Sequence, residues 1–268
     1  MKQCKICDTI SAIILGTFVA NTDVMLKYCL STVICTFFIL SIQAQTKISH
    51  SKWTALLQEH VDPYGIIDFK GFKANEDKLD EYLDKLSANH PQPFWKTDEQ
   101  KSYWINAYNA FTVKLILMNY PLNSIMDIKE DDKDAWHIPF IEIGDKIYTL
   151  DYIEKTMLLG QFNDSRIHFV INCSAKSCPI LRNKAYSTDN IDVELRLATK
   201  RFINDSRFNI LDKQHVQVSQ LFNWYKDDFL KDEVSIQVYL NKNTPHLEIS
   251  KNATLNFMKY NWKLNDKK

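Results

Sequence analysis

Apolar side chains recur at helical spacing along much of the chain, and one stretch carries this pattern most strongly. Between Asp98 and Asn119, residues three or four positions apart form an apolar stripe: Trp104, Tyr108, Phe111, Leu115 and Met118. Thr97 stands at the N-cap position, and Pro121 follows the last residue of the pattern. A helix is therefore predicted over 98–119. Weaker patterns predict helices over 51–61, 76–86, 150–159, 190–204 and 221–229, and near Ile236.

Short apolar runs between the helical patterns predict the strands. The stretch from Pro139 to Leu150 is typical of a hairpin with its turn at Gly144-Asp145. A second hairpin is expected between 208–211 and 216–218, and the run from His168 to Cys173 is expected to be a short buried strand. These elements predict a single α+β domain over residues 45–268, rich in helices, with short antiparallel hairpins and a central buried strand.

The N-terminal region has the order of a secretory signal peptide. A lysine beside Met25 precedes an apolar run over 29–42, and Ala44 is a small residue at which cleavage is expected. The run is shorter than the roughly 20 residues that a membrane-spanning helix needs. We therefore expect export to the periplasm or the extracellular space, with translation starting at Met25 and residues 1–44 outside the domain. A retained N-terminal membrane anchor is the alternative, and it would be the protein's only contact with a membrane.

Composition narrows the classes of ligand. Lysine plus arginine and aspartate plus glutamate both number 33, so no basic excess favours a nucleic-acid partner. The five glycines are scattered, whereas a phosphate-binding loop needs clustered glycines, so a nucleotide ligand is not expected. The charged run at 129–134 is interpreted as a solvated loop. We expect no cofactor and no metal, and a peptide or a cell-envelope component of unknown identity as ligand.

Cleavage after Ala44 would leave Cys173 and Cys178 as the only cysteines. Strand alternation would place His168 and Asn172 on one face and Cys173 on the opposite, apolar face, where it would pack in the core. Cys178 follows a polar turn that contains Lys176 and precedes Pro179, a residue favoured in the first turn of a helix. A cysteine at a helix N-terminus near a cation has a lowered pKa, which makes Cys178 the expected nucleophile.

Three hypotheses follow for this stretch. In the first, Cys178 is the nucleophile of an acyl-transfer enzyme (a peptidase, an amidase or a transglutaminase-like enzyme) and His168 is the general base. Asn172, or else Asn106 or Asn109, orients the imidazole or binds an oxyanion. In the second, the two cysteines form a structural disulfide in a non-catalytic envelope protein. In the third, the thiols and His168 bind a metal, although this set lacks a fourth ligand.

Four residues are expected to support the site: Asn106, Asn109, Glu154 and Cys173. Asn106 and Asn109 lie three residues apart within the predicted helix, where asparagine is a poor helix former. Their amides are expected either to brace a neighbouring loop or to orient a catalytic group. Glu154 is a candidate carboxyl partner for His168, and His137 is a spare candidate base or ligand.

The motifs together resemble the family of domain of unknown function 547. The resemblance rests on segments that span most of the chain after Ala44, in order: Tyr103–Asn109, Leu150–Glu154, His168–Cys173, Ser177–Pro179, Leu221–Phe229 and Tyr260–Trp262. It implies no established activity. A fold similar to papain-like or transglutaminase-like thiol enzymes is our conjecture. In those enzymes the cysteine usually precedes the histidine, whereas here His168 precedes Cys178.

Overall fold

A computed structural model describes residues 48–231 and 233–267 of the chain. The expected signal peptide, the cleavage after Ala44 and the start at Met25 lie outside these residues. Ile48–Lys268 form one compact unit with an α+β fold. Among the described helices, none has the length and the apolar character that crossing a membrane requires.

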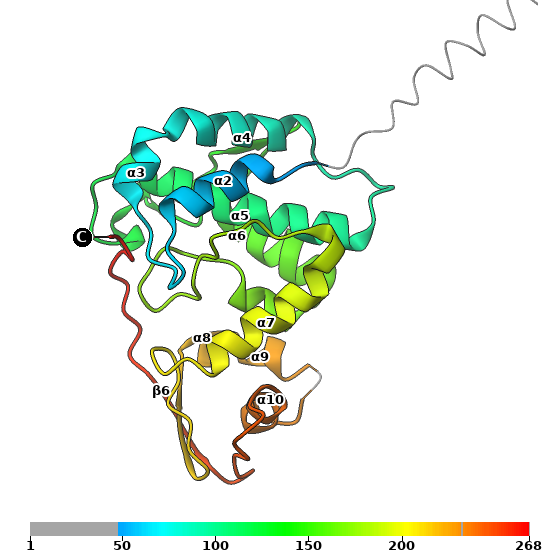
Figure 1. Ribbon diagram of the computed structural model, residues 1–268, viewed down its shortest axis with the longest axis vertical. Coiled ribbons are helices and arrows are strands. Elements are labelled where there is room, and N and C mark those ends of the chain that lie inside the picture. Colours follow the sequence, from blue (N-terminus) through cyan, green and yellow to red (C-terminus); the bar gives the residue numbers. More distant parts are fainter. Residues whose placement is uncertain (1–47, 232, 268) are drawn as a thin grey trace, which may run out of the picture. The chain divides into compact units, whose positions relative to one another are not determined.

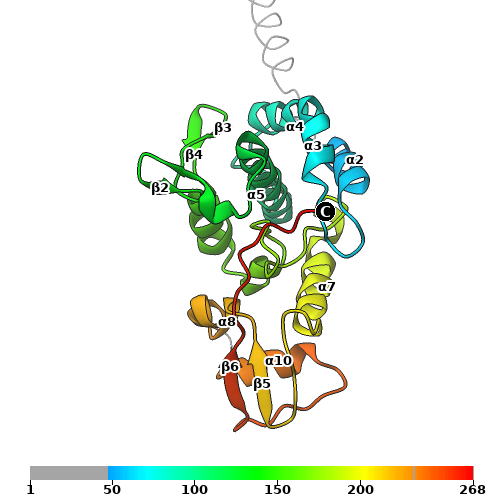
Figure 2. The same cartoon turned by 90° about the vertical axis from the view of Figure 1, so that its left-hand side faces the viewer.

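The helix α5 (Thr97–Asn119) is the centre of the N-terminal half. Almost every side chain from Ser102 to Leu117 is buried, which is the pattern of a helix enclosed on all sides. The predicted helix over 98–119 is confirmed, with Lys96 rather than Thr97 at the N-cap. Figures 1 and 2 show the helices that surround it: α2 (Ser51–His60), α3 (Phe69–Ala74) and α4 (Glu76–Ala88).

The middle of the chain contains two short antiparallel hairpins and two irregular helices. The charged run forms the hairpin of β1 (Lys129–Glu130) and β2 (Lys133–Asp134), and the hairpin predicted over 139–150 forms from β3 (Ile141–Ile143) and β4 (Lys146–Tyr148). Thr149 caps the short α6 (Leu150–Tyr152), which continues as a π-helix, η2 (Ile153–Gly160). Short 3₁₀ helices occur at η1 (Ile125–Asp127) and η4 (Thr188–Asn190).

The expected buried strand over 168–173 is wrong. Ser165–Phe169 forms a 3₁₀ helix, η3, whose first turn Asp164 caps, and the chain then runs on without regular structure through Pro179. A short apolar run is compatible with either a strand or a helical turn, and here the Asp-Ser cap selects the turn. The alternation argument that separated the faces of His168 and Cys173 therefore does not apply.

The C-terminal half has its own elements. The helices are α7 (Ile191–Ile203), α8 (Leu221–Trp224), α9 (Lys226–Phe229) and α10 (Ile236–Asn243). β5 (His215–Val218) makes a bridge with Ile210, as expected, but its main partner is the parallel strand β6 (Thr254–Phe257). Figure 2 shows β5 and β6 side by side at the lower end of the domain. This pairing was not predicted.

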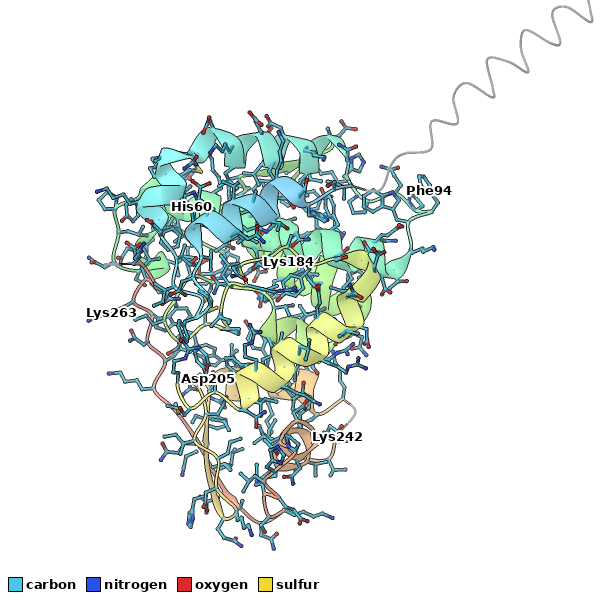
Figure 3. The ribbon with its side chains drawn as sticks, in the orientation of Figure 1. His60, Phe94, Lys184, Asp205, Lys242 and Lys263 are labelled. Atoms are coloured by element: carbon cyan, nitrogen blue, oxygen red, sulfur yellow. The ribbon has the colours of Figure 1, made fainter. Side chains whose placement is uncertain are left out.

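Two hydrophobic cores meet at the start of the cysteine-containing loop. Phe169 packs with the aromatic side chains of the C-terminal half, whereas Val170 and Ile171 belong to the core around α5. After β6 the chain returns along the domain to the helices of the N-terminal half (Figures 1 and 2). Lys263 projects outward from this returning segment (Figure 3). The loop after Phe169 thus lies where both cores and the C-terminal segment come together.

Candidate functional site

The loop over 170–179 is fixed from one side by a side chain of the central helix. Asn109 Nδ2 donates a hydrogen bond to the carbonyl oxygen of Val170 (2.9 Å), and its Oδ1 accepts one from the backbone N–H of Asn172 (2.8 Å). Asn106 forms the same two-point contact with the backbone of Tyr186 (2.9 Å in each direction). Both amides therefore brace neighbouring loops, which was one of the two expected roles.

Asn172 closes the loop on itself. Its Nδ2 donates to the carbonyl oxygen of Pro179 (2.6 Å), and its Oδ1 accepts from the N–H of Ser174 (2.9 Å). The side chain thus ties the two ends of the loop together, which brings Cys173 and Cys178 into contact. The structure gives Asn172 a role in shaping the loop, and its amide makes no contact with His168 within the described residues.

The returning C-terminal segment holds the outer edge of the loop. Backbone N–H groups of Lys176 and Ser177 donate to carbonyl oxygens of Lys263 and Asn261 (2.8 and 3.2 Å), and Ala175 forms an antiparallel bridge with Leu264. These contacts place Tyr260 against the loop: its hydroxyl lies 3.4 Å from the Cys173 sulfur. A residue from the far end of the chain therefore completes the surroundings of the thiols.

The two cysteines form a hydrogen-bonded pair of free thiols. The backbone N–H of Cys173 donates to the Sγ of Cys178 (2.8 Å), and the Cys178 thiol donates to the carbonyl oxygen of Ile171 (4.0 Å). The neighbouring Cys178 thiol, followed by the hydroxyl of Tyr260, lowers the pKa of Cys173, because each stabilises its thiolate. Burial raises the pKa of Cys178 well above its usual range.

The expected burial of the two cysteines is therefore reversed. Cys178 is only 6% exposed, whereas Cys173, expected in the core, is partly exposed. No helix begins at Pro179, and Lys176 is exposed to solvent, so neither of the features invoked to activate Cys178 is present. The disulfide of the second hypothesis is not formed, because both cysteines are free.

Glu154 is a buried carboxylate near the thiols. It is the second residue of the π-helix η2 and is 6% exposed. Its two oxygens accept hydrogen bonds from the phenols of Tyr108 (2.9 Å) and Tyr225 (2.8 Å). Burial and the charge of Glu154 raise the pKa of both tyrosines, so the phenols remain proton donors. π-helical segments occur frequently at functional sites.

His168 is held by a carboxylate that the sequence did not identify. Its Nε2 lies 2.9 Å from Oδ2 of Asp228, and its ring packs against Tyr225 with centroids 4.0 Å apart. The expected pairing of His168 with Glu154 is thus wrong, because Glu154 binds the two tyrosines. His168 forms no hydrogen bond with either cysteine within the described residues.

The His168–Asp228 pair predicts that the free energy of unfolding changes with pH in the acid range. The hydrogen bond from His168, followed by an interaction with Lys231, lowers the pKa of Asp228 to about 2. A folded-state pKa below the unfolded value means that the stabilisation is complete above about pH 4 and is lost as the pH falls through 2. The free energy of unfolding in urea should therefore fall less steeply between pH 4 and 2 for Asp228→Asn than for the wild type.

The matched control for this prediction is Asp145→Asn. Asp145 is an exposed residue of the β3–β4 turn, and its side chain makes no hydrogen bond or ion pair with the other described residues. Asp145→Asn should leave the pH dependence of the free energy of unfolding between pH 4 and 2 as it is in the wild type. Parallel slopes for Asp228→Asn and the wild type would show that the His168–Asp228 contact contributes nothing to stability.

These groups surround one cavity of about 320 Å³. Its interior holds Cys173, Cys178, Glu154 and His168. Its walls are largely aromatic: Tyr108, Trp136, Trp224, Tyr225, Tyr260 and Trp262. The other ionisable side chains that line it include Asp134, His137, Asp151 and Lys155. His137, the spare candidate, is exposed and bonded to Asp134 (2.6 Å). Within the described residues, no group of three or more histidine, cysteine, aspartate or glutamate side chains is placed to hold a metal ion.

Sequence reasoning missed five lining or supporting residues of this cavity: Tyr108, Trp224, Tyr225, Asp228 and Tyr260. Their signal in the sequence was the clustering of aromatic residues, Trp224-Tyr225 and Tyr260-Asn261-Trp262, in the C-terminal part of the chain. The chemistry of the cavity nevertheless arises from residues far apart in the chain, so the partners could not be assigned from spacing.

Comparison with known proteins identifies the central part of the chain. Residues 93–203 match the model of a family described as protein of unknown function, DUF547. The match includes both cysteines, His168, Glu154 and the bracing asparagines. The segments 221–229 and 260–262, which also carried the sequence resemblance, lie outside it. Neither a curated protein nor a solved structure matches the chain.

Proposed function

The chain is a member of the DUF547 family through residues 93–203, and from that premise we propose that it transfers acyl groups through a thiolate at Cys173. The observation that carries the proposal is the thiol pair. Cys173 is partly exposed in the cavity, and the Cys178 thiol and the Tyr260 hydroxyl, 3.4 Å from its sulfur, lower its pKa. A thiolate is the nucleophilic form of cysteine, and donors aimed at the sulfur stabilise that form.

The reaction balances with groups of the cavity. The Cys173 thiolate attacks the carbonyl carbon of an amide or ester, the bond to the leaving nitrogen or oxygen breaks, and a thioester forms. The leaving group takes a proton from the Cys178 thiol or the Tyr260 hydroxyl, which both neighbour the Cys173 sulfur. Water or an amine then attacks the thioester, its C–S bond breaks, and the proton returns to the donor.

His168 has the position to serve the second half of this reaction. It lines the same cavity, and Asp228 fixes its imidazole through Nε2. An oriented imidazole is the usual group that removes a proton from an attacking water or amine. In this proposal, therefore, His168 keeps its expected role as base, but acts on the acceptor rather than on a cysteine.

The substrate class follows from the expected export. The apolar run over 29–42 and Ala44 support secretion, and an exported acyl-transfer protein meets peptides and the amides of the cell envelope. The aromatic walls of the cavity suit the apolar parts of such a substrate. We therefore propose a peptide or cell-envelope amide as the acyl donor. A papain-like or transglutaminase-like fold remains a conjecture.

The acyl-enzyme is the species to measure. The purified chain is incubated with a panel of p-nitrophenyl esters and peptide amides, quenched in acid, and examined by intact mass and peptide mapping. The expected result is a mass increase equal to one acyl group, located on Cys173 and removed by hydroxylamine. An adduct on Cys178, or labelling that persists in Cys173→Ser, would overturn the proposed nucleophile.

The thiol pair also predicts a reversible block of this activity by oxidation. Cys173 attacks a disulfide oxidant such as oxidised glutathione, and one glutathione leaves as its thiol. Cys178 then attacks the Cys173 sulfur and releases the second glutathione. We expect a mass lower by about 2 Da, corresponding to the two hydrogens lost, and no alkylation until a reductant is added.

This oxidation also tests the alternative function, a non-catalytic envelope protein with a Cys173–Cys178 disulfide. The matched control is Cys178→Ser, which should stop at the mixed disulfide with one glutathione attached. If the oxidised form is so stable that the wild type purifies only as the disulfide and never forms an acyl adduct after reduction, the structural alternative replaces the catalytic one.

A further inference from the structure

Glu154 is a buried charge without a cationic partner. Its carboxylate is bonded to two phenols, and no ion pair involves it within the part of the chain that the structure describes. Burying a carboxylate is unfavourable unless hydrogen bonds and an opposite charge compensate for the lost hydration. Two neutral donors supply only the hydrogen bonds. Glu154 also lines the cavity, so a ligand there can supply the opposite charge.

The lysine that lines the cavity is already engaged, because Lys155 Nζ lies 2.7 Å from Asp151. Asp134 is also paired, with His137 Nδ1 at 2.6 Å. The lining carboxylates other than Glu154 therefore already have partners. The negative charge in the cavity that lacks a cationic partner is therefore that of the Glu154 carboxylate and, when it is ionised, that of the Cys173 thiolate.

The walls have the chemistry that accompanies cation binding. Trp262 packs against Trp136, Trp224 and Tyr260, with centroids 5.9, 5.7 and 4.4 Å apart, and all four line the cavity. Trp224 remains 47% exposed, so this aromatic wall is accessible from solvent. The faces of tryptophan and tyrosine attract ammonium groups, most strongly where water is excluded.

We propose that the cavity binds a primary ammonium group between the aromatic wall and Glu154, and that the bearer of this group is the acyl acceptor. The inference rests on the proposed acyl transfer for the role of acceptor, but the binding itself does not require turnover. It assigns the site to amine-bearing ligands such as a lysine side chain, and it makes the protein a transferase rather than a hydrolase.

The transfer step then balances as follows. The bound ammonium loses one proton to the His168 imidazole and becomes a neutral amine, which attacks the carbonyl carbon of the Cys173 thioester. A C–N bond forms, the C–S bond breaks, and the second proton of the amine passes to the group that protonated the first leaving amine. The products are a new amide, the original thiolate and a His168 imidazolium, which releases its proton to solvent water before the next cycle.

The test measures binding without chemistry. The full chain carrying Cys173→Ser is titrated with Nα-acetyl-lysine amide and with the neutral, similarly shaped Nα-acetyl-norleucine amide, and the tryptophan fluorescence of the wall and the heat of binding are followed. We expect the lysine derivative to bind at least about tenfold more tightly, as a cation–aromatic contact and a carboxylate contact allow. Glu154→Gln should reduce that ratio to near one.

Each outcome decides the proposal. Equal binding of the two ligands, tighter binding of the neutral one, or no binding of either to the Cys173→Ser chain would overturn it. The ligand comparison needs no substitution of Glu154, so it stands even if Glu154→Gln does not fold. Amine binding without any acyl adduct in the cysteine-containing chain would reject the proposed function only. An acyl adduct without amine preference would reject this inference only.

Discussion

Replacing Cys173 by serine is expected to abolish rapid alkylation of the folded protein at neutral pH, whereas replacing Cys178 should not. The reason is the asymmetry of the pair: Cys173 is partly exposed with a lowered pKa, and Cys178 is enclosed with a raised one. Only the thiolate reacts with iodoacetamide. The measurement is the rate of iodoacetamide labelling, followed by intact mass and assigned by peptide mapping.

The pH profile of labelling distinguishes an activated thiolate from a merely accessible one. The Cys178 thiol and the Tyr260 hydroxyl lower the pKa of Cys173, so removing either donor should move the labelling profile of Cys173 to higher pH. In Cys178→Ala and Tyr260→Phe, Cys173 should therefore be labelled more slowly than in the wild type at pH 7. At a pH well above the pKa of Cys173 in each variant, it should be labelled at the wild-type rate. Cys178→Ser keeps a hydroxyl donor and should shift the profile less than Cys178→Ala.

Two results would contradict this assignment. Rapid labelling that maps to Cys178 and survives in Cys173→Ser would restore the nucleophile predicted from sequence. A profile that does not move in Cys178→Ala and Tyr260→Phe would leave Cys173 exposed but not activated. Denatured protein, in which both cysteines label at the rate of an ordinary thiol, provides the reference for each variant.

The reversed burial of the two cysteines is a feature that the sequence could not predict. The alternation argument depended on a strand over 168–173, and an apolar run of six residues does not exclude a helical turn. Once Ser165–Phe169 forms that turn, nothing in the local pattern fixes which cysteine faces solvent. That choice is made by the clamp from Asn172 to Pro179 and by the C-terminal segment.

Long-range contacts account for the other differences. Glu154 is bonded to tyrosines 46 and 71 positions away, His168 to an aspartate 60 positions away, and Cys173 to a tyrosine 87 positions away. A periodicity argument covers a dozen or so residues and has no access to such pairs. The parallel pairing of β5 with β6 was missed for the same reason, because the two strands lie far apart in sequence.

The asparagines of the central helix could be predicted because their signal is local. A polar amide in the middle of an apolar helix is unfavourable unless its hydrogen bonds are satisfied. Asn106 and Asn109 therefore predict buried hydrogen-bond partners even without a structure. The sequence could not say what those partners are. Both turn out to be backbone groups of loops, and the loop bound by Asn109 carries the two thiols.

Replacing Asn109 by alanine should therefore strongly destabilise the fold. The substitution leaves the carbonyl oxygen of Val170 and the N–H of Asn172 without their partner in a buried site. Each unsatisfied buried group costs about 1–3 kcal/mol, so we expect the free energy of unfolding to fall by about 2–6 kcal/mol. Urea unfolding followed by far-UV circular dichroism measures this change.

Asn119→Ala is the matched control, because Asn119 lies at the end of the same helix, is exposed, and bonds only the carbonyl oxygen of Leu115. Its free energy of unfolding should stay within about 0.5 kcal/mol of the wild type. If Asn109→Ala behaves like this control, the amide does not hold the loop. If it destabilises the protein as expected, amide hydrogen exchange should rise at Asn172 and Cys173, because the loop that carries the two thiols loses its attachment to the helix.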